Sequence, residues 1–141
     1  MASFEIIGGK KLSGEVIPQG AKNEALQIVS AVLLTPERVT ISNIPNIRDV
    51  MKLIELLQEM GVDVTKIDDH TYAFEAKNVN LEYLLTDDFK KKGGALRGSI
   101  MIIGPLLARF GVAYIPEPGG DPRAQALSHR ALRELAEQLR A

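Results

Sequence analysis

The chain has 141 residues, a formal net charge of −1, 45% hydrophobic residues and 25% charged residues. This composition is typical of one globular domain, and it excludes the broad basic field that nonspecific nucleic-acid binding requires. The absence of cysteine excludes disulfides, thiolate metal sites and a cysteine nucleophile. No apolar run has the length of a signal peptide or a membrane span, so we expect a cytoplasmic protein without a membrane partner.

The first predicted feature is a hairpin within residues 1–18. Residues 4–7 and 12–17 are rich in strand-forming apolar residues, and Gly8-Gly9 separates them as a turn. Pro18 ends the second strand. Such a hairpin exposes apolar side chains, so self-association through it is a reasonable hypothesis.

Three segments then show apolar residues at helical spacing. They are residues 22–34, 50–60 and 96–110. Pro36 stops the first, Asp49 can cap the second, and Gly61 and Gly111 are placed to end the second and third. Short apolar runs between them predict strands at 39–41, 62–67, 72–74 and 112–115, with a turn at residues 68–70.

A repeat links these helices and strands. A pair of leucines is followed five residues after its second member by a valine on three occasions, at Val39, Val62 and Val112. Three matches in phase favour a duplicated helix-strand unit. We therefore predict an α/β (α+β) fold in which helices pack on one face of a mixed sheet.

Candidate site residues are cations at helix starts, where the helix dipole disfavours positive charge. Lys22 follows Gly20-Ala21, and Arg97 stands in the first turn after the run Lys90–Lys92 and two glycines. A free helix N-terminus with a nearby cation is suited to phosphate or carboxylate groups. Surface solvation is the alternative, and it is the stronger interpretation for Lys90–Lys92.

An exposed loop carries the third candidate. Pro118-Gly119-Gly120 turns the chain sharply and leaves Asp121 at its tip, where a turn residue is the alternative to an acid catalyst. The two histidines, His70 and His129, have no metal-ligand spacing around them, so we assign them no role and predict no metal site.

Five strings of the sequence occur together in a known order. They are Gly20-Ala21-Lys22-Asn23-Glu24-Ala25-Leu26, Asn43-Ile44-Pro45 with Asp49-Val50, Leu96-Arg97-Gly98-Ser99-Ile100, Gly104-Pro105-Leu106-Leu107-Ala108-Arg109-Phe110-Gly111 and Pro118-Gly119-Gly120-Asp121. Over residues 1–121 they resemble the N-terminal portion of the UDP-N-acetylglucosamine enolpyruvyl transferase (1-carboxyvinyltransferase) family. The 3-phosphoshikimate transferase is the nearest rival on the same fold, but the first and last strings favour the sugar-nucleotide enzyme.

The resemblance implies a lobe of repeated helix-strand units and a reaction of peptidoglycan precursor synthesis. The enolpyruvyl group of phosphoenolpyruvate would pass to the 3′-hydroxyl of UDP-N-acetylglucosamine, without a cofactor. By carry-over Lys22 would bind phosphoenolpyruvate and stabilise charge, Asn23 would contact both substrates, and Arg97 would hold phosphate or carboxylate. Asp121 would stand where most members have a cysteine that acts as general acid.

The family pattern stops after Asp121. Residues 122–141 lack lysine and read as an amphipathic helix with Leu132, Leu135 and Leu139 on one stripe. We expect a non-family tail, whether engineered, chimeric or frameshifted, and negligible transferase activity from this truncated chain alone. Two alternatives stay open: a structural fragment without catalysis, and a residual phosphate or nucleotide-sugar binding module.

Overall fold

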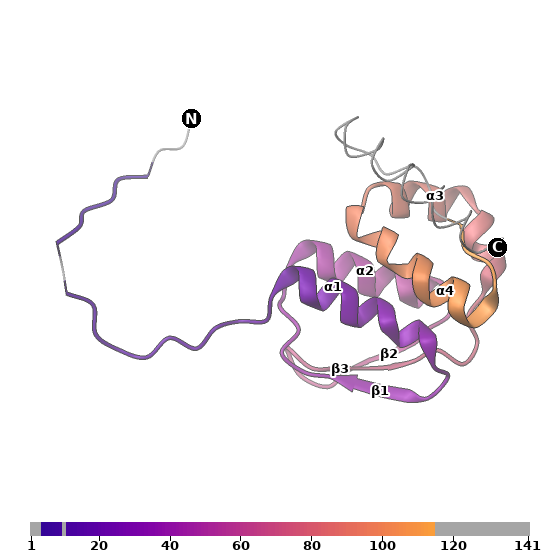
Figure 1. Cartoon of the computed structure of the whole chain (residues 1–141), viewed down its shortest axis with the longest axis horizontal. Coiled ribbons are helices and arrows are strands. Elements are labelled where there is room, and N and C mark those ends of the chain that lie inside the picture. The colour runs from indigo at the N-terminus through magenta and orange to yellow at the C-terminus, as the bar shows by residue number, and fades with distance from the viewer. Residues whose placement is uncertain (1–3, 10, 115–141) are drawn as a thin grey trace, which may run out of the picture.

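The computed structural model describes residues 4–9 and 11–114. Within these residues a compact body begins at residue 20, and the chain before it is extended (Figure 1). The elements in chain order are α1 (Lys22–Ala31), η1 (Val32–Leu34), β1 (Arg38–Ile41), α2 (Arg48–Glu59), β2 (Asp63–Lys66), β3 (Tyr72–Glu75), η2 (Leu81–Leu85), α3 (Asp87–Gly94), η3 (Arg97–Ile102) and α4 (Ile103–Phe110), where η marks a 3-10 helix.

The sheet has three strands in the order β1-β3-β2, and both pairings are antiparallel. Phe74 on the central strand is paired with Val39 on one side and Val64 on the other, which gives the sheet one apolar face. The helices cover one face of the sheet (Figure 1). The architecture is thus α/β with helices on a sheet, as predicted, but in the described residues the sheet is antiparallel where a mixed sheet was expected.

α2 shows why the predicted helices form. Its buried side chains recur at helical spacing, and they are Val50, Leu53, Ile54, Leu56 and Leu57. Gly61 ends the helix at φ +91°, and a Cβ there would lie 2.4 Å from the Asn78 carbonyl oxygen, so glycine is needed. Asp49 does not cap α2: Ile47 is the N-cap without a side-chain hydrogen bond, and Asp49 lies in the first turn.

The core joins the inner sides of α1, α2 and α4 to the central strand. Its largest fully buried side chains include Phe74, Phe89, Leu33, Leu53 and Leu106. The predicted helices over 22–34 and 96–110 both form, although each contains a 3-10 segment, η1 at the end of the first and η3 at the start of the second. Gly111 ends α4 in the left-handed region at φ +70°, as predicted.

The predicted N-terminal hairpin is wrong for the described residues. Residues 4–9 and 11–19 contain no strand, and the apolar side chains of Phe4 and Ile6 are 94% and 90% exposed. The physical reason is that a two-stranded hairpin is marginal in water unless its apolar face packs against another element. The strand pattern is present, but nothing in the described body covers it.

One further expectation fails, and two helical elements were not predicted. Val112–Tyr114, which completes the third copy of the predicted repeat, lies in no strand of the described part. Residues 81–94, which have no apolar periodicity, form η2 and α3. α3 is stabilised at its N-terminal end. The Thr86 hydroxyl accepts from the Phe89 amide at 3.2 Å, and the acidic Asp87 and Asp88 occupy the first turn.

Candidate functional site

The start of α1 is fixed by a close contact between two backbone segments. A Cβ on Gly20 would lie 2.0 Å from the carbonyl oxygen of Asn43. Only glycine therefore lets the loop after β1 lie against the entrance to α1. Asn43 itself has φ +59°, a conformation that asparagine tolerates better than most residues. The contact orients the first turn of α1, which carries Lys22 and Asn23.

Arg97 is brought to the same region by a second close approach. Arg97 begins η3, and the next residue, Gly98, lies against Leu26 of α1, where an added Cβ would be 3.0 Å from the leucine methyl groups. The small residue lets η3 pack on α1. Ser99 is buried and donates from its hydroxyl to the Gly93 carbonyl at 2.8 Å, which fixes the start of η3 to the end of α3.

Lys22, Asn23 and Arg97 line one open cavity of about 770 Å³ between α1, α2 and η3. The other lining residues are Leu26, Gln27, Asp49, Ala95, Gly98, Ile100 and Met101. The structure therefore brings three of the four predicted site residues to one cavity. The fourth, Asp121, lies outside the described residues, as does His129.

An ion pair crosses the cavity wall. The Lys22 ammonium lies 2.7 Å from Asp49 Oδ2, with both side chains nearly half exposed. The hydrogen bond from Lys22 and then its charge hold the pKa of Asp49 below its ordinary value, and Lys52 and Arg48 add weaker contributions. Sequence reasoning treated Asp49 as a helix cap and missed this role. An acidic residue beside two cations at a helix start, Arg48-Asp49 with Lys52, is the signal that could have indicated it.

The cavity suits an anion. Arg97 is exposed and forms no ion pair within the described residues, so its guanidinium is available for a bidentate carboxylate or phosphate contact. Lys22 and Arg97 contribute two positive charges and Asp49 contributes one negative charge. The amide of Asn23 adds a neutral donor and acceptor, which a polar ligand group can use.

The lysine run lies elsewhere. Lys90, Lys91 and Lys92 precede η3 and α4 as predicted, but they lie within α3, and Lys91 and Lys92 stand in its last turn, where the helix dipole favours cations. Lys92 is paired with Glu59 at 2.5 Å and Asp88 at 2.8 Å. These contacts support the solvated, structural interpretation of the run.

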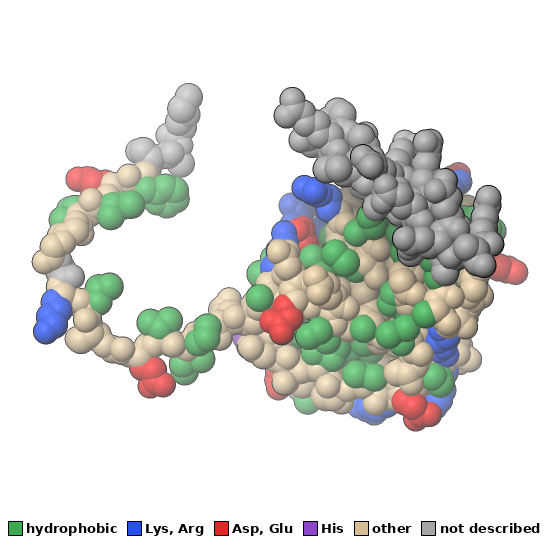
Figure 2. Space-filling model, in the orientation of Figure 1, with side chains coloured by type: hydrophobic (Ala, Val, Ile, Leu, Met, Phe, Trp, Pro, Cys, Tyr) green, Lys and Arg blue, Asp and Glu red, His purple; other side chains and the backbone are tan. Residues whose placement is uncertain are grey.

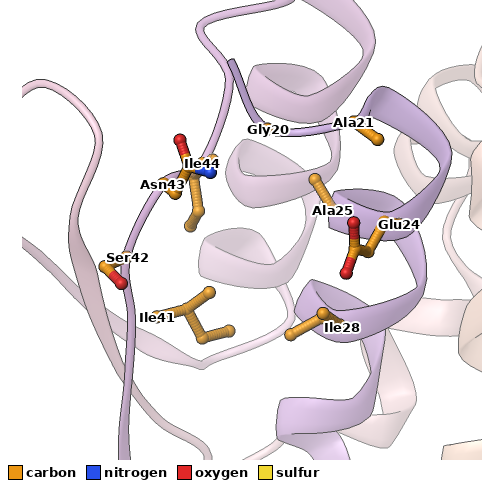
Figure 3. A pocket seen from close by; sticks show the side chains of 9 residues that line it. All are labelled: Gly20, Ala21, Glu24, Ala25, Ile28, Ile41, Ser42, Asn43 and Ile44. Carbon is orange, nitrogen blue, oxygen red and sulfur yellow. The ribbon is translucent and has the colours of Figure 1, made fainter. Parts of the chain in front are cut away.

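A second, smaller cavity of about 90 Å³ lies on the other side of α1. Figure 3 shows Ile28 from the helix and Ile41 from β1 pointing toward one another at one end, with Glu24 and Asn43 nearer the other. Its lining contains the carboxylate of Glu24 and apolar side chains but no lysine or arginine. It therefore lacks the positive charge that an anionic ligand needs. His70, to which the sequence assigned no role, donates from Nδ1 to the Ile44 carbonyl oxygen at 3.0 Å and helps to fix this loop.

In the described part of the chain, no group of three His, Cys, Asp or Glu side chains is arranged to hold a metal ion. None of the described helices is both long enough and apolar enough to cross a membrane.

The pattern of the family described as EPSP synthase (3-phosphoshikimate 1-carboxyvinyltransferase) matches residues 6–141. The chain belongs to the EPSP synthase family. The match extends through residues 122–141, and the assignment of these residues to a separate tail remains a prediction.

Among relatives within the EPSP synthase family, high identity is found to proteins named UDP-N-acetylglucosamine 1-carboxyvinyltransferase. The chain is 61% identical to the one from Bacteroides thetaiotaomicron and 60% to one from Bacteroides fragilis, each over 121 residues. Identity to the Porphyromonas gingivalis protein is 54% over 121 residues. Each alignment covers 86% of this chain but 28% of the relative, so the chain spans just over a quarter of the length of these relatives.

Proposed function

We propose that the cavity between α1, α2 and η3 is the phosphoenolpyruvate side of an enolpyruvyl transferase site whose acceptor is UDP-N-acetylglucosamine. The observation that carries the proposal is that Lys22, Asn23 and Arg97 line one cavity. The names of the relatives at 54–61% identity support the acceptor. Both substrates carry phosphate, and two cations at the cavity supply the complementary charge. Because charged metabolites do not cross a bilayer unaided, we place this reaction in the cytoplasm.

The proposed reaction is an addition followed by an elimination. The 3′-hydroxyl loses its proton to water as its oxygen forms a bond to C2 of phosphoenolpyruvate, and the methylene C3 takes a proton from Asp121. C3 then returns a proton to the Asp121 carboxylate as the bond from C2 to the phosphate oxygen breaks, which leaves the enolpyruvyl ether and free phosphate. In this scheme Lys22 and Arg97 stabilise the anionic groups, Asn23 orients the acceptor, and Asp121 donates the proton to C3.

We propose that residues 1–141 alone bind these ligands weakly and transfer the enolpyruvyl group at a negligible rate. The cavity is open, and the Lys22 and Asp49 side chains on its wall are 45% and 44% exposed. Water therefore reaches the cations, and electrostatic stabilisation of a reacting group is weak when water is not excluded. Further protein surface over this cavity is needed to enclose a substrate.

Titration calorimetry of the chain with phosphoenolpyruvate and with UDP-N-acetylglucosamine tests the site. Lys22→Ala and Arg97→Ala should each weaken binding by about tenfold or more, the loss expected for one charge-assisted hydrogen bond. Lys66→Ala is the matched control, because Lys66 stands on the sheet edge and pairs with Asp69. Equal affinity in all four proteins would reject the site.

The same titrations, together with an assay of phosphate release, separate the two remaining functional alternatives. Binding that depends on Lys22 and Arg97 without phosphate release from the two substrates together would identify a binding module. Absence of binding to either substrate in the unsubstituted chain would identify a structural fragment. Phosphate release that is lost in Arg97→Ala would support a working transferase.

We also propose that the extended N-terminal segment self-associates. Its exposed apolar side chains are Phe4, Ile6, Ile7, Leu12, Val16 and Ile17, each at least 81% exposed. Such a segment gains stability when it pairs with a second copy. The oligomer measured by analytical ultracentrifugation should dissociate in Ile6→Ser/Ile7→Ser and persist in the control Glu5→Gln. A monomeric unsubstituted chain would contradict self-association.

A further inference from the structure

Exposed apolar and small residues gather on the outer sides of α1, η1, η3 and α4, beside the polar Glu24 and Gln27 of α1. The apolar and small residues of this face are Ile28, Ala31, Leu34, Met101, Gly104 and Ala108, all of them exposed. Ile28 is 43%, Leu34 50% and Met101 41% exposed. The outward side of a surface helix normally carries charged residues.

The two helices present these residues as one surface. α4 packs against η1, which continues α1, and α1 packs against η3, which leads into α4. In Figure 2 groups of green side chains lie over the front of the body along α1 and the nearby part of α4, with an acidic side chain in front of the start of α1. Exposed apolar side chains that gather on one surface are typical of a docking site.

We propose that residues 128–141 of the same chain dock on this face as an amphipathic helix. Leu132, Leu135 and Leu139 recur at spacings of three and four, and Ala131 and Ala136 extend the same stripe. Arg133, Glu134 and Glu137 lie off the stripe and would face water. A stripe of leucines opposite a face with Gly104 and two alanines allows close packing of helix on helix.

The length of the chain permits this arrangement. Tyr114 lies just beyond the end of α4, and residues 115–127 are thirteen residues that span at most about 45 Å when extended. A helix over 128–141 is about 21 Å long, comparable with α1 and η1 together. A segment tethered this close has an effective concentration in the millimolar range, which favours its own chain over a second copy.

Thiol labelling tests the proposal, since the chain contains no cysteine. Ala108→Cys places a thiol on the face, and Thr65→Cys places a control thiol on the exposed part of β2. In the full chain we expect the thiol at position 108 to react about tenfold more slowly than the one at position 65, as it would if the tethered segment covered it most of the time.

The protection should depend on the leucine stripe. Combined with Ala108→Cys, Leu135→Asp should restore rapid labelling, and Glu134→Gln, on the other side of the same turn, should leave the protection intact. Equal labelling at positions 108 and 65 would overturn the proposal. So would protection that survives Leu135→Asp, or protection that falls on dilution and therefore comes from a second copy.

Discussion

The ammonium of Lys22 lies 2.7 Å from Oδ2 of Asp49, and this ion pair joins the first turn of α1 to the first turn of α2. The carboxylate holds the lysine side chain against the cavity wall. A phosphate or carboxylate ligand must therefore share the ammonium with Asp49 or displace it. Arg97 has no such partner in the described residues, so the two cations of the cavity differ in how freely they can meet a ligand.

Asp49→Asn should remove a pH-dependent contribution to stability. Because Lys22 lowers the pKa of Asp49, the pair stabilises the fold above the ordinary carboxylate pKa of about 3.9, and this stability is lost as the pH falls through the lowered pKa. Thermal melts should show a small difference between Asp49→Asn and the unsubstituted chain at neutral pH. That difference should vanish at acidic pH and shrink in high salt. Glu55→Gln on the same helix is the control, and a difference that persists at acidic pH would contradict the assignment.

Gly20→Ala should destabilise the fold at the site. The new Cβ would lie 2.0 Å from the Asn43 carbonyl oxygen, and a backbone atom cannot move aside cheaply. Overpacking of this kind costs about 1–3 kcal/mol. Chemical denaturation should report that loss, while Gly8→Ala, which meets no atom within 4 Å, should leave the unfolding free energy unchanged. An unaltered midpoint for Gly20→Ala would mean that the loop does not need to touch α1.

The candidate site could be predicted only in part from the sequence. Lys22 and Arg97 were chosen because a cation at a helix start opposes the helix dipole, and both line the same cavity. The role of Asp49 could not be predicted from the sequence, because its contact with Lys22 spans 27 residues of chain and depends on how α1 packs against α2. Leu26 and Gly98 likewise enter the site through helix packing, which no local pattern records.

Local patterns also explain which elements were missed. α2 was predicted because its buried residues recur on one stripe, whereas α3 buries only Phe89 and Gly93 and so has no stripe to detect. Its signal is the order of charges, acidic residues after Thr86 and lysines toward the end. The N-terminal strands have the right alternation, but they lack a packing partner among the described residues, and a pattern alone does not supply one.

Tyr83 should make the fold sensitive to alkaline pH. Its hydroxyl lies 2.7 Å from both Glu59 Oε2 and Asp88 Oδ2, and burial followed by these hydrogen bonds raises the pKa of the phenol far above its ordinary value. The unfolded chain loses this proton near pH 10 and the folded chain keeps it. Stability is therefore complete below about pH 10 and falls as the pH rises above it.

The alkaline effect should be absent in Tyr83→Phe, which has no ionisable proton. Denaturant melts at rising pH should show the unsubstituted chain losing stability more steeply than this variant. Tyr114→Phe is the control, because the Tyr114 side chain is exposed. Parallel pH profiles for the unsubstituted chain and Tyr83→Phe would contradict the shift.

Arg109 should be a main contributor to the position of α4. Its Nη1 donates to the carbonyl oxygens of Leu33 at 3.0 Å and Ala76 at 2.8 Å, which lie at the end of η1 and just after β3. Arg109→Met keeps the apolar stem but leaves both carbonyls without this donor, and we expect a loss of about 2 kcal/mol in the unfolding free energy. Arg109→Lys should recover only part of the loss, because an ammonium does not reproduce the planar fork of the guanidinium.

The matched control for Arg109 is Arg38→Met, at an exposed position on β1. Equal stability of the two methionine variants would show that the carbonyls of Leu33 and Ala76 find other donors. A loss confined to Arg109→Met would instead mean that one side chain near the end of α4 ties that helix to both layers of the body. In that case hydrogen exchange should quicken at α4 amides in Arg109→Met before it quickens in α2, because α2 is held by its own buried stripe.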